Sequence, residues 1–287
     1  MRFGIMMFPA DRTMQPVEFG AAVEQRGFES VWFPEHSHIP TSRQSSFGGR
    51  PGGPPLPDYY WRSHEPFVAL AAIAATTTTL RLGTGVTLVA QRDPIWLAKQ
   101  VASLDTISGG RLTLGIGYGW NREEMLHHGV RYGERRAILR EKVLVMKELW
   151  TRDEASFHGD HVDLSPSWAW PKPVSQPHPA IVMGAGPGPK TFAHIIEFCD
   201  GWMPNYGRYD LEGGISALRR AAADAARDPD TIELAVTSGP RDPGALAHLA
   251  ELGVRRVLFT LTPGTDAVVV AQLDACAAVV ERFGDPR

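Results

Sequence analysis

The sequence predicts an α/β fold, specifically a (β/α)8 TIM barrel with long loop insertions after the second strand and before the fifth. Eight apolar, strand-like runs occur within 287 residues, and helix-like segments separate them, as this barrel requires. The runs are continuously apolar, which is typical of parallel strands that are covered on both faces. The competing fold is a doubly wound sheet, but the glycine-rich dinucleotide turn that usually opens such a sheet is absent here.

Each expected strand is a short, apolar run that ends in glycine, proline or polar residues. The first, RFGIMMF, shows no polar alternation at all. In chain order, the expected strands are Arg2 to Phe8, Ser30 to Phe33, Leu80 to Leu88, Arg111 to Gly117, Ala180 to Gly184, Asp200 to Pro204, Thr231 to Ser238 and Val254 to Leu261.

The expected helices carry recognisable start and stop signals. Pro16 stands near the start of the first helix and Gly27 just past its end. Asp93 and Pro94 begin another helix, which stops at Gly109. At helical spacing, Arg135 to Trp150 places apolar side chains on one arc and charged side chains opposite. The remaining helices are expected over Lys190 to Phe198, Leu211 to Arg227, Pro243 to Leu252 and Asp266 to Phe283.

Two long stretches interrupt this alternation within what we expect to be one domain over residues 1–287. Residues 37–64 are rich in glycine, proline and polar residues, and residues 151–179 have a similar composition. Both contain aromatic residues that a disordered linker rarely carries. We therefore expect lid-like insertions without regular structure.

Composition limits the possible partners and the location. The formal net charge is −3 and no block of like charge occurs, so we expect neither nucleic acid nor an anionic membrane as a partner. No apolar stretch is long enough to span a bilayer, and the N-terminus does not resemble a secretion signal. The two isolated cysteines, Cys199 and Cys276, suit a reducing compartment and are expected to be small buried residues. These features predict a cytoplasmic protein.

Active sites of such barrels lie at the carboxyl ends of the strands, so the residues that follow each strand are the candidates. Glu35 and His36 follow the second strand, where an acid and a base are placed beside each other. Glycine collects at the ends of the third, fourth and fifth strands. Backbone without a Cβ atom can approach a flat ring or a phosphate closely and offer its N–H groups. The candidates at these three ends are Gly85, Val86, Gly117, Tyr118, Gly119, Gly184, Ala185, Gly186 and Pro187.

Several familiar chemistries do not fit these residues. The glycine spacing after the fourth strand is not that of a dinucleotide fingerprint. Pro189 stands where a nucleoside-triphosphate-binding loop needs glycine, although a plain anion site at a helix N-terminus fits as well as an ordinary glycine-rich turn. No metal is expected, because the pair His36 and His38 finds no histidine after the fifth, sixth or eighth strand. No candidate nucleophile for covalent hydrolysis occurs.

Four stretches resemble the bacterial luciferase-like monooxygenase superfamily, and most of all its branch of oxidoreductases that use the deazaflavin coenzyme F420. They are GFESVWFPEH (27–36), LRLGTGVTLVAQRDPIWLAKQVASLDTISGGRLTLGIGYGW (80–120), RRAILREKVLVMKELWT (135–151) and PAIVMGAGPGPKTFAHIIEFCDGWMPN (179–205). The last 80 or so residues match only in pattern. The resemblance implies a barrel that holds a flavin-type ring at its carboxyl-end mouth.

The resemblance also assigns roles to residues. It implies a bulge with a non-prolyl cis peptide at Gly85-Val86 behind the ring, and a phosphate-binding turn over Gly184 to Pro187. It implies that His36 exchanges a proton with the substrate during hydride transfer, which suits an imidazole because its unperturbed pKa lies near neutrality. Glu35 would orient His36 or hydrogen-bond the ring edge. The competing interpretation of Glu35 and His36 is a strand end that makes only loop hydrogen bonds.

One departure bears on the substrate. Sugar-phosphate dehydrogenases of this branch carry a glutamate just after the fourth strand, where this sequence has Trp120. We therefore expect a flatter and less polar small-molecule substrate, with Trp32 and Trp120 beside it.

Three functions remain open at this point. The first is an F420-dependent oxidoreductase, which carries hydride and reacts poorly with oxygen. The second is an FMN-dependent monooxygenase that receives reduced flavin from a partner flavin reductase. The third is a non-catalytic flavin-binding protein. Relatives commonly form dimers, so a homodimer is expected.

Overall fold

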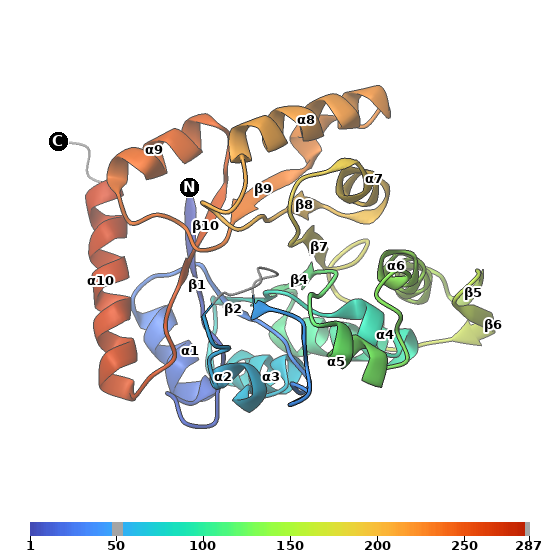
Figure 1. Ribbon diagram of the computed structural model, residues 1–287, viewed down its shortest axis with the longest axis horizontal. Coiled ribbons are helices and arrows are strands. Elements are labelled where there is room, and N and C mark those ends of the chain that lie inside the picture. The colour runs from blue at the N-terminus through green and yellow to red at the C-terminus, as the bar shows by residue number, and fades with distance from the viewer. Residues whose placement is uncertain (48–53, 285–287) are drawn as a thin grey trace.

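The computed structural model describes residues 1–47 and 54–284 and confirms the predicted TIM barrel (Figure 1). Eight parallel strands close in the order β1-β10-β9-β8-β7-β4-β3-β2, so the first strand pairs with the last. The barrel strands are β1 (Arg2–Met6), β2 (Ser30–Phe33), β3 (Arg81–Thr84), β4 (Leu112–Ile116), β7 (Ala180–Met183), β8 (Gly201–Trp202), β9 (Glu233–Val236) and β10 (Arg256–Thr260).

Helices surround the barrel, and α10 at the C-terminal end of the chain lies beside α1 (Figure 1). The expected start of α4 is confirmed, because the Asp93 side chain accepts a hydrogen bond from the backbone N–H of Trp96. Gly109 ends that helix in the left-handed conformation. The outer helices are α1 (Pro16–Gln25), α3 (Pro66–Thr76), α4 (Pro94–Ser108), α6 (Arg135–Thr151), α7 (Pro189–Phe198), α8 (Leu211–Asp224), α9 (Pro243–Glu251) and α10 (Asp266–Gly284).

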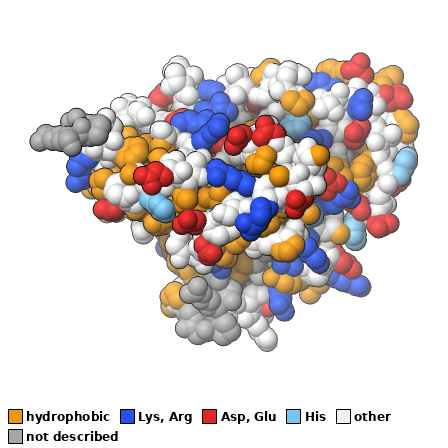
Figure 2. All heavy atoms as spheres, turned by 90° about the horizontal axis from the view of Figure 1, so that it is seen from above, with side chains coloured by type: hydrophobic (Ala, Val, Ile, Leu, Met, Phe, Trp, Pro, Cys, Tyr) orange, Lys and Arg blue, Asp and Glu red, His pale blue; other side chains and the backbone are white. Residues whose placement is uncertain are grey.

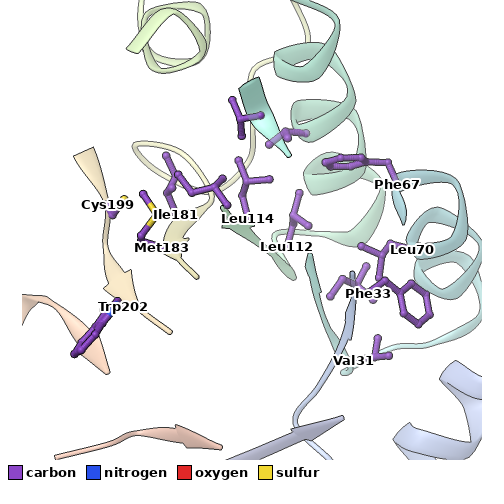
Figure 3. Packing of buried hydrophobic residues seen from close by; sticks show 14 of the residues in the cluster. Val31, Phe33, Phe67, Leu70, Leu112, Leu114, Ile181, Met183, Cys199 and Trp202 are labelled. Atoms are coloured by element: carbon purple, nitrogen blue, oxygen red, sulfur yellow. The ribbon is translucent and has the colours of Figure 1, made fainter. Parts of the chain in front are cut away.

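The main hydrophobic core lies between the barrel strands and the helices. Leu112 and Leu114 of β4 point into this layer, and Phe67 and Leu70 of α3 fill it from the helical side (Figure 3). A second, smaller cluster draws its members from six strand regions around the barrel and includes Trp32. Side chains that converge from so many strands lie inside the barrel, which is therefore packed rather than open.

Four segments differ from the expectation. Residues 151–179 contain an antiparallel hairpin, β5 (Glu154–His158) and β6 (Asp163–Trp168), which packs beside α6. Residues 37–64 contain the short helix α2 (Tyr59–Arg62), while positions 48–53 of that insertion lie outside the described residues. The sequence analysis also did not delimit α3 or the short helix α5 (Arg122–His127).

The surface carries both signs of charge. Lysine and arginine side chains are interspersed with aspartate and glutamate side chains over the face seen in Figure 2. Among the described helices, none combines the length and the apolar character that crossing a lipid bilayer requires. Cys199 and Cys276 are both buried, as predicted.

A cluster of charged residues closes the amino end of the barrel. Arg256 is 3% exposed, and it donates to Glu29 (Nη2 to Oε1, 2.8 Å) and to Glu233 (Nη1 to Oε1, 2.5 Å). Burial works to raise the pKa of Glu29, but the hydrogen bond and charge of Arg256 hold that pKa below its ordinary value. This contribution to stability is therefore present at neutral pH and is lost as the pH falls through the folded-state pKa of Glu29.

We expect Arg256→Met to lower the free energy of unfolding by roughly 3 kcal/mol, because it removes the buried cation that Glu29 and Glu233 share and leaves them only the more exposed Arg2 and Arg81. The matched control is Arg26→Met, whose partner Asp274 has a side chain that is 61% exposed. That exposed pair should contribute less than about 1 kcal/mol. Urea denaturation at neutral pH measures both values, and equal losses would contradict the role of Arg256.

Candidate active site

A cavity of about 650 Å³ opens at the carboxyl ends of the barrel strands. It is lined by twelve of the thirteen residues that the sequence analysis selected, all except Trp32. These are Glu35, His36, Gly85, Val86, Gly117, Tyr118, Gly119, Trp120, Gly184, Ala185, Gly186 and Pro187.

The third barrel strand ends in an irregular segment that projects toward the cavity. The peptide between Gly85 and Val86 is cis, at the position that the family resemblance implied. A Cβ atom on Gly117 would lie 2.4 Å from Val86 Cγ2, and one on Gly184 would lie 2.4 Å from Val86 Cγ1. These two glycines therefore make room for the Val86 side chain, whereas the sequence analysis had explained them by close approach of a ligand.

His36 is held on both of its ring nitrogens. Its Nδ1 lies 2.7 Å from Oε2 of Glu124, and Trp120 Nε1 donates to its Nε2 at 3.2 Å. A carboxylate can only accept and an indole N–H can only donate. These two partners therefore favour the neutral tautomer with hydrogen on Nδ1, and they leave the Nε2 lone pair on the side of Trp120, which lines the cavity.

Glu35 lies beside His36 in sequence but performs a different task, which corrects the expected orienting role. Its Oε1 accepts from Arg92 Nε at 2.7 Å, and its Oε2 accepts from the backbone N–H of Leu88 at 3.0 Å. Burial raises the pKa of Glu35, and the charge of Arg92 opposes that rise. Consecutive side chains at a strand end point in different directions, which is why Glu35 does not contact the same groups as His36. Through Leu88 and Arg92, Glu35 connects the end of β2 to the segment that follows the Gly85-Val86 bulge.

Glu124, which the sequence analysis missed, is the carboxylate that contacts His36. It lies on α5 and its side chain is fully buried. Asn121 caps this helix, with its Oδ1 accepting from the N–H of Glu124 at 3.3 Å. An asparagine followed three residues later by glutamate is a helix-start signal, and it could have located α5 in the sequence.

Trp32 does not border the cavity, which corrects the expectation that it lies beside the substrate. It is 1% exposed within the barrel, and its Nε1 donates to Ser30 Oγ at 2.8 Å. A Cβ atom on Gly83 would lie 2.2 Å from the indole, so that glycine accommodates the ring. Successive side chains of a strand point to opposite faces, and the Trp32 position in β2 points into the barrel, below the opening of the cavity.

Basic residues that were not selected from the sequence gather at one side of the cavity. Arg135, Arg136 and Arg208 all line it, together with the turn over Gly184 to Pro187. The Nε of Arg135 is buried and has no hydrogen-bond partner among the described residues. Burial lowers the pKa of Arg135, and the like charge of Arg136 acts in the same direction. An anion bound here would satisfy the orphan donor and balance the charges.

Aromatic residues line another part of the cavity. Phe8 lies 4.4 Å from Tyr60 between ring centroids, and Phe47 lies 6.2 Å from Trp120. Tyr60 lies 5.3 Å from His36 by the same measure. Burial raises the pKa of Tyr60, so its hydroxyl stays protonated. The part of the cavity next to His36 is therefore flat-walled and largely apolar.

A closed barrel with this mouth defines a class of α/β enzymes that bind their ligands at the carboxyl ends of the strands. Residues 1–240 match the family model described as luciferase-like monooxygenase, and the chain belongs to that family.

Curated relatives include proteins with stated cofactors. An uncharacterised protein of Mycobacterium tuberculosis (strain ATCC 25618 / H37Rv) is 41% identical over 286 residues, which cover 99% of this chain and 97% of that protein. The F420-dependent hydroxymycolic acid dehydrogenase of the same organism is 29% identical, covering 84% of this chain and 63% of that one. A 5,10-methylenetetrahydromethanopterin reductase from Methanolobus tindarius is 25% identical, covering 82% and 64%.

Solved structures share the fold over the full chain. The monooxygenase RslO1 from Streptomyces bottropensis has a TM-score of 0.80 at 19% identity, covering 99% of this chain and 100% of that one. An F420-dependent secondary alcohol dehydrogenase in complex with an F420-acetone adduct has a TM-score of 0.75 at 17% identity, covering 99% of each chain. Both likenesses concern the fold.

We expect Glu124→Ala to release the tautomer of His36, because Nδ1 loses the acceptor that holds its hydrogen. Nitrogen chemical shifts of the labelled imidazole at a pH where it is neutral should change from the Nδ1–H form toward a mixture that includes Nε2–H. Glu123→Ala is the matched control, because Glu123 bonds to the backbone N–H of Gln44 and Ser45 instead. Shifts that stay at the Nδ1–H values in Glu124→Ala would contradict this assignment.

Proposed function

We propose that this protein transfers hydride between coenzyme F420 and a small organic substrate, with His36 moving the accompanying proton. The observation that carries the proposal is the Nε2 of His36, which is an acceptor on the apolar side of the cavity, where it receives the Trp120 N–H, while Nδ1 is held by a buried carboxylate. F420-dependent relatives among the matched proteins support the choice of cofactor.

The residues of the cavity fit a deazaflavin with an anionic tail. Val86 would support the ring, and the turn over Gly184 to Pro187 would receive the tail near Arg135 and Arg136. The orphan Nε of Arg135 is the donor that such a tail would satisfy. When bound, the deazaflavin supplies a carbon that accepts or gives hydride.

The chain's own residues perform the proton chemistry. The Nε2 of His36 accepts the proton of a substrate hydroxyl as that carbon is oxidised, and it returns the proton to a carbonyl oxygen in the reverse direction. Glu124 holds the ring and stabilises the imidazolium that forms. In the free protein Trp120 donates a hydrogen bond to Nε2, and the substrate hydroxyl replaces the Trp120 N–H there on binding.

The substrate part of the cavity suits an apolar molecule that carries one hydroxyl or carbonyl group. Phe8, Tyr60, Phe47 and Trp120 form its walls. Glu124 does not line the cavity, so it does not face the substrate as an acid. This arrangement disfavours a sugar phosphate, which would need several polar partners.

A second candidate is an FMN-dependent monooxygenase that receives reduced flavin from a partner reductase. The full-length likeness in fold to the monooxygenase RslO1 favours it. FMN carries one phosphate and a shorter tail, so it would contact fewer of the arginines that line the cavity. We place it second for that reason.

Titrating the cofactor-free protein with F420 and with FMN separates the two candidates. We expect F420 to bind more tightly, and Arg135→Met to weaken it roughly tenfold or more through loss of a charged hydrogen bond. Arg152→Met is the control, because Arg152 lies on the surface with a side chain that is 68% exposed. Tight binding of FMN alone would overturn the choice of F420.

His36→Ala should leave F420 affinity nearly unchanged and lower turnover about 10²–10⁴-fold, because the proton then lacks a positioned acceptor. His64→Ala serves as the control, since His64 lies at the far end of the insertion that follows His36 and bonds only to Gln15 in the hydrogen bonds described for its side chain. Steady-state kinetics with F420 and a panel of secondary alcohols gives both values. Turnover that survives in His36→Ala would remove His36 from the mechanism, and a wild-type protein that binds F420 without turnover would point to a non-catalytic binding protein.

A further inference from the structure

A continuous series of hydrogen bonds leads from His36 to the protein surface, away from the cavity. It begins at Nδ1 of His36, which lies 2.7 Å from Oε2 of Glu124. The other oxygen of that carboxylate, Oε1, lies 3.3 Å from Oγ of Ser37 and also accepts from the backbone N–H of Ser37 at 3.1 Å. Ser37 is exposed, so the series passes from a fully buried carboxylate to solvent in one step.

Two histidines contact the Ser37 hydroxyl, and a third histidine contacts one of them. Its Oγ lies 2.7 Å from Nε2 of His128 and 2.9 Å from Nδ1 of His38. The Nε2 of His38 in turn lies 2.8 Å from Nδ1 of His127. Within the described residues, no group of three or more His, Cys, Asp or Glu side chains is arranged to hold a metal ion.

We propose that Glu124, Ser37 and this histidine group form a proton path that connects His36 with bulk water. The inference rests on the proposed function, in which His36 gives or takes one proton in each turnover. The Nε2 of His36 faces a cavity that cofactor and substrate would fill, so its proton balance is restored through Nδ1 instead. Glu124 and Ser37 act through His36 and are positioning residues, not catalytic ones.

The transfer conserves atoms and charge at every step. After His36 has accepted a substrate proton at Nε2, the Nδ1 proton passes to Oε2 of Glu124. The carboxyl group, now neutral, turns so that this proton faces Ser37, and the proton passes to the Ser37 hydroxyl, which releases its own proton to His128 or His38. These imidazoles deliver one proton to water. His36 then carries hydrogen on Nε2, and it regains the Nδ1–H form after product release, when Nε2 gives its proton to water in the emptied cavity and Nδ1 takes one back along the path. The reverse order supplies a proton to His36 when it acts as an acid.

The side chains along this path have the properties that a relay needs. A hydroxyl can donate and accept at the same time, and an imidazole can do so through its two nitrogens. The unperturbed pKa of histidine lies near neutrality, so a surface group of histidines exchanges protons readily with water. Of the links in the series, only the Ser37 hydroxyl joins Glu124 to the histidines.

Ser37→Ala removes that link and keeps the surrounding structure. The backbone N–H of Ser37 still bonds to Glu124, so the carboxylate stays in place. In the cofactor-free protein with labelled histidine, we expect the Nδ1–H of His36 to exchange with water at least about tenfold more slowly, since a positioned proton-transfer group typically contributes about 10²–10⁴-fold. Nuclear magnetic resonance measures this exchange without any turnover.

Ser45→Ala is the matched control for the exchange measurement. Ser45 lies in the same insertion, and its hydroxyl accepts from the backbone N–H of Arg122 at the start of α5. It therefore loses one hydrogen bond to the same helix without touching the path. Slower exchange in Ser37→Ala alone supports the path, whereas equal exchange rates in the wild type and both variants would overturn it.

A second measurement tests the path during turnover. We expect Ser37→Ala to lower kcat with little change in KM, and added imidazole buffer to restore kcat in this variant but not in His36→Ala. A kcat deficit that imidazole leaves unchanged would count against the path. If the wild-type protein shows no turnover with F420, the proposed function fails, and the exchange measurement still decides whether the path exists.

Discussion

The whole site depends on how closely the ends of β3, β4 and β7 approach one another around Val86. These three strands are neighbours in the closed barrel, so their carboxyl ends meet at one rim. Gly117 and Gly184 flank Val86 from either side, and a Cβ atom on either would overlap it. The bulge can therefore project toward the cavity only because the two adjacent strand ends lack side chains. A substitution at either glycine would displace the surface on which a planar ring can rest.

The adjacent residues Glu35 and His36 have different partners and different roles at the end of β2. Glu35 binds Arg92 and the N–H of Leu88, and so anchors the chain that follows the bulge. His36 faces the other way and receives its carboxylate from Glu124, which is 88 positions distant in sequence. One acid thus anchors the segment after the Gly85-Val86 bulge, and another holds His36, the proposed proton carrier. The two tasks are coupled because both begin at the end of β2.

Local patterns and the family resemblance account for what could be predicted. Continuous apolar runs located the barrel strands, and the resemblance located the cis peptide at Gly85-Val86. Contacts that form only when the barrel closes could not be predicted from the sequence. In sequence Glu124 and Arg135 are ordinary charged residues, and only the folded chain brings Glu124 to His36 and Arg135 to the cavity. Trp32 was misplaced because a position in a strand does not reveal which face its side chain occupies.

The two sides of the cavity differ in charge and polarity, and this difference restricts how a ligand can lie in it. Arginines and the turn after β7 occupy one side, while aromatic rings and His36 occupy another. A molecule with an anionic tail and a flat head gains most when the tail meets Arg135 and the head reaches Val86. In the proposed function, the part of the cavity next to His36 and the aromatic walls would then remain for the substrate. The charge distribution thus favours an arrangement in which the substrate would lie beside His36.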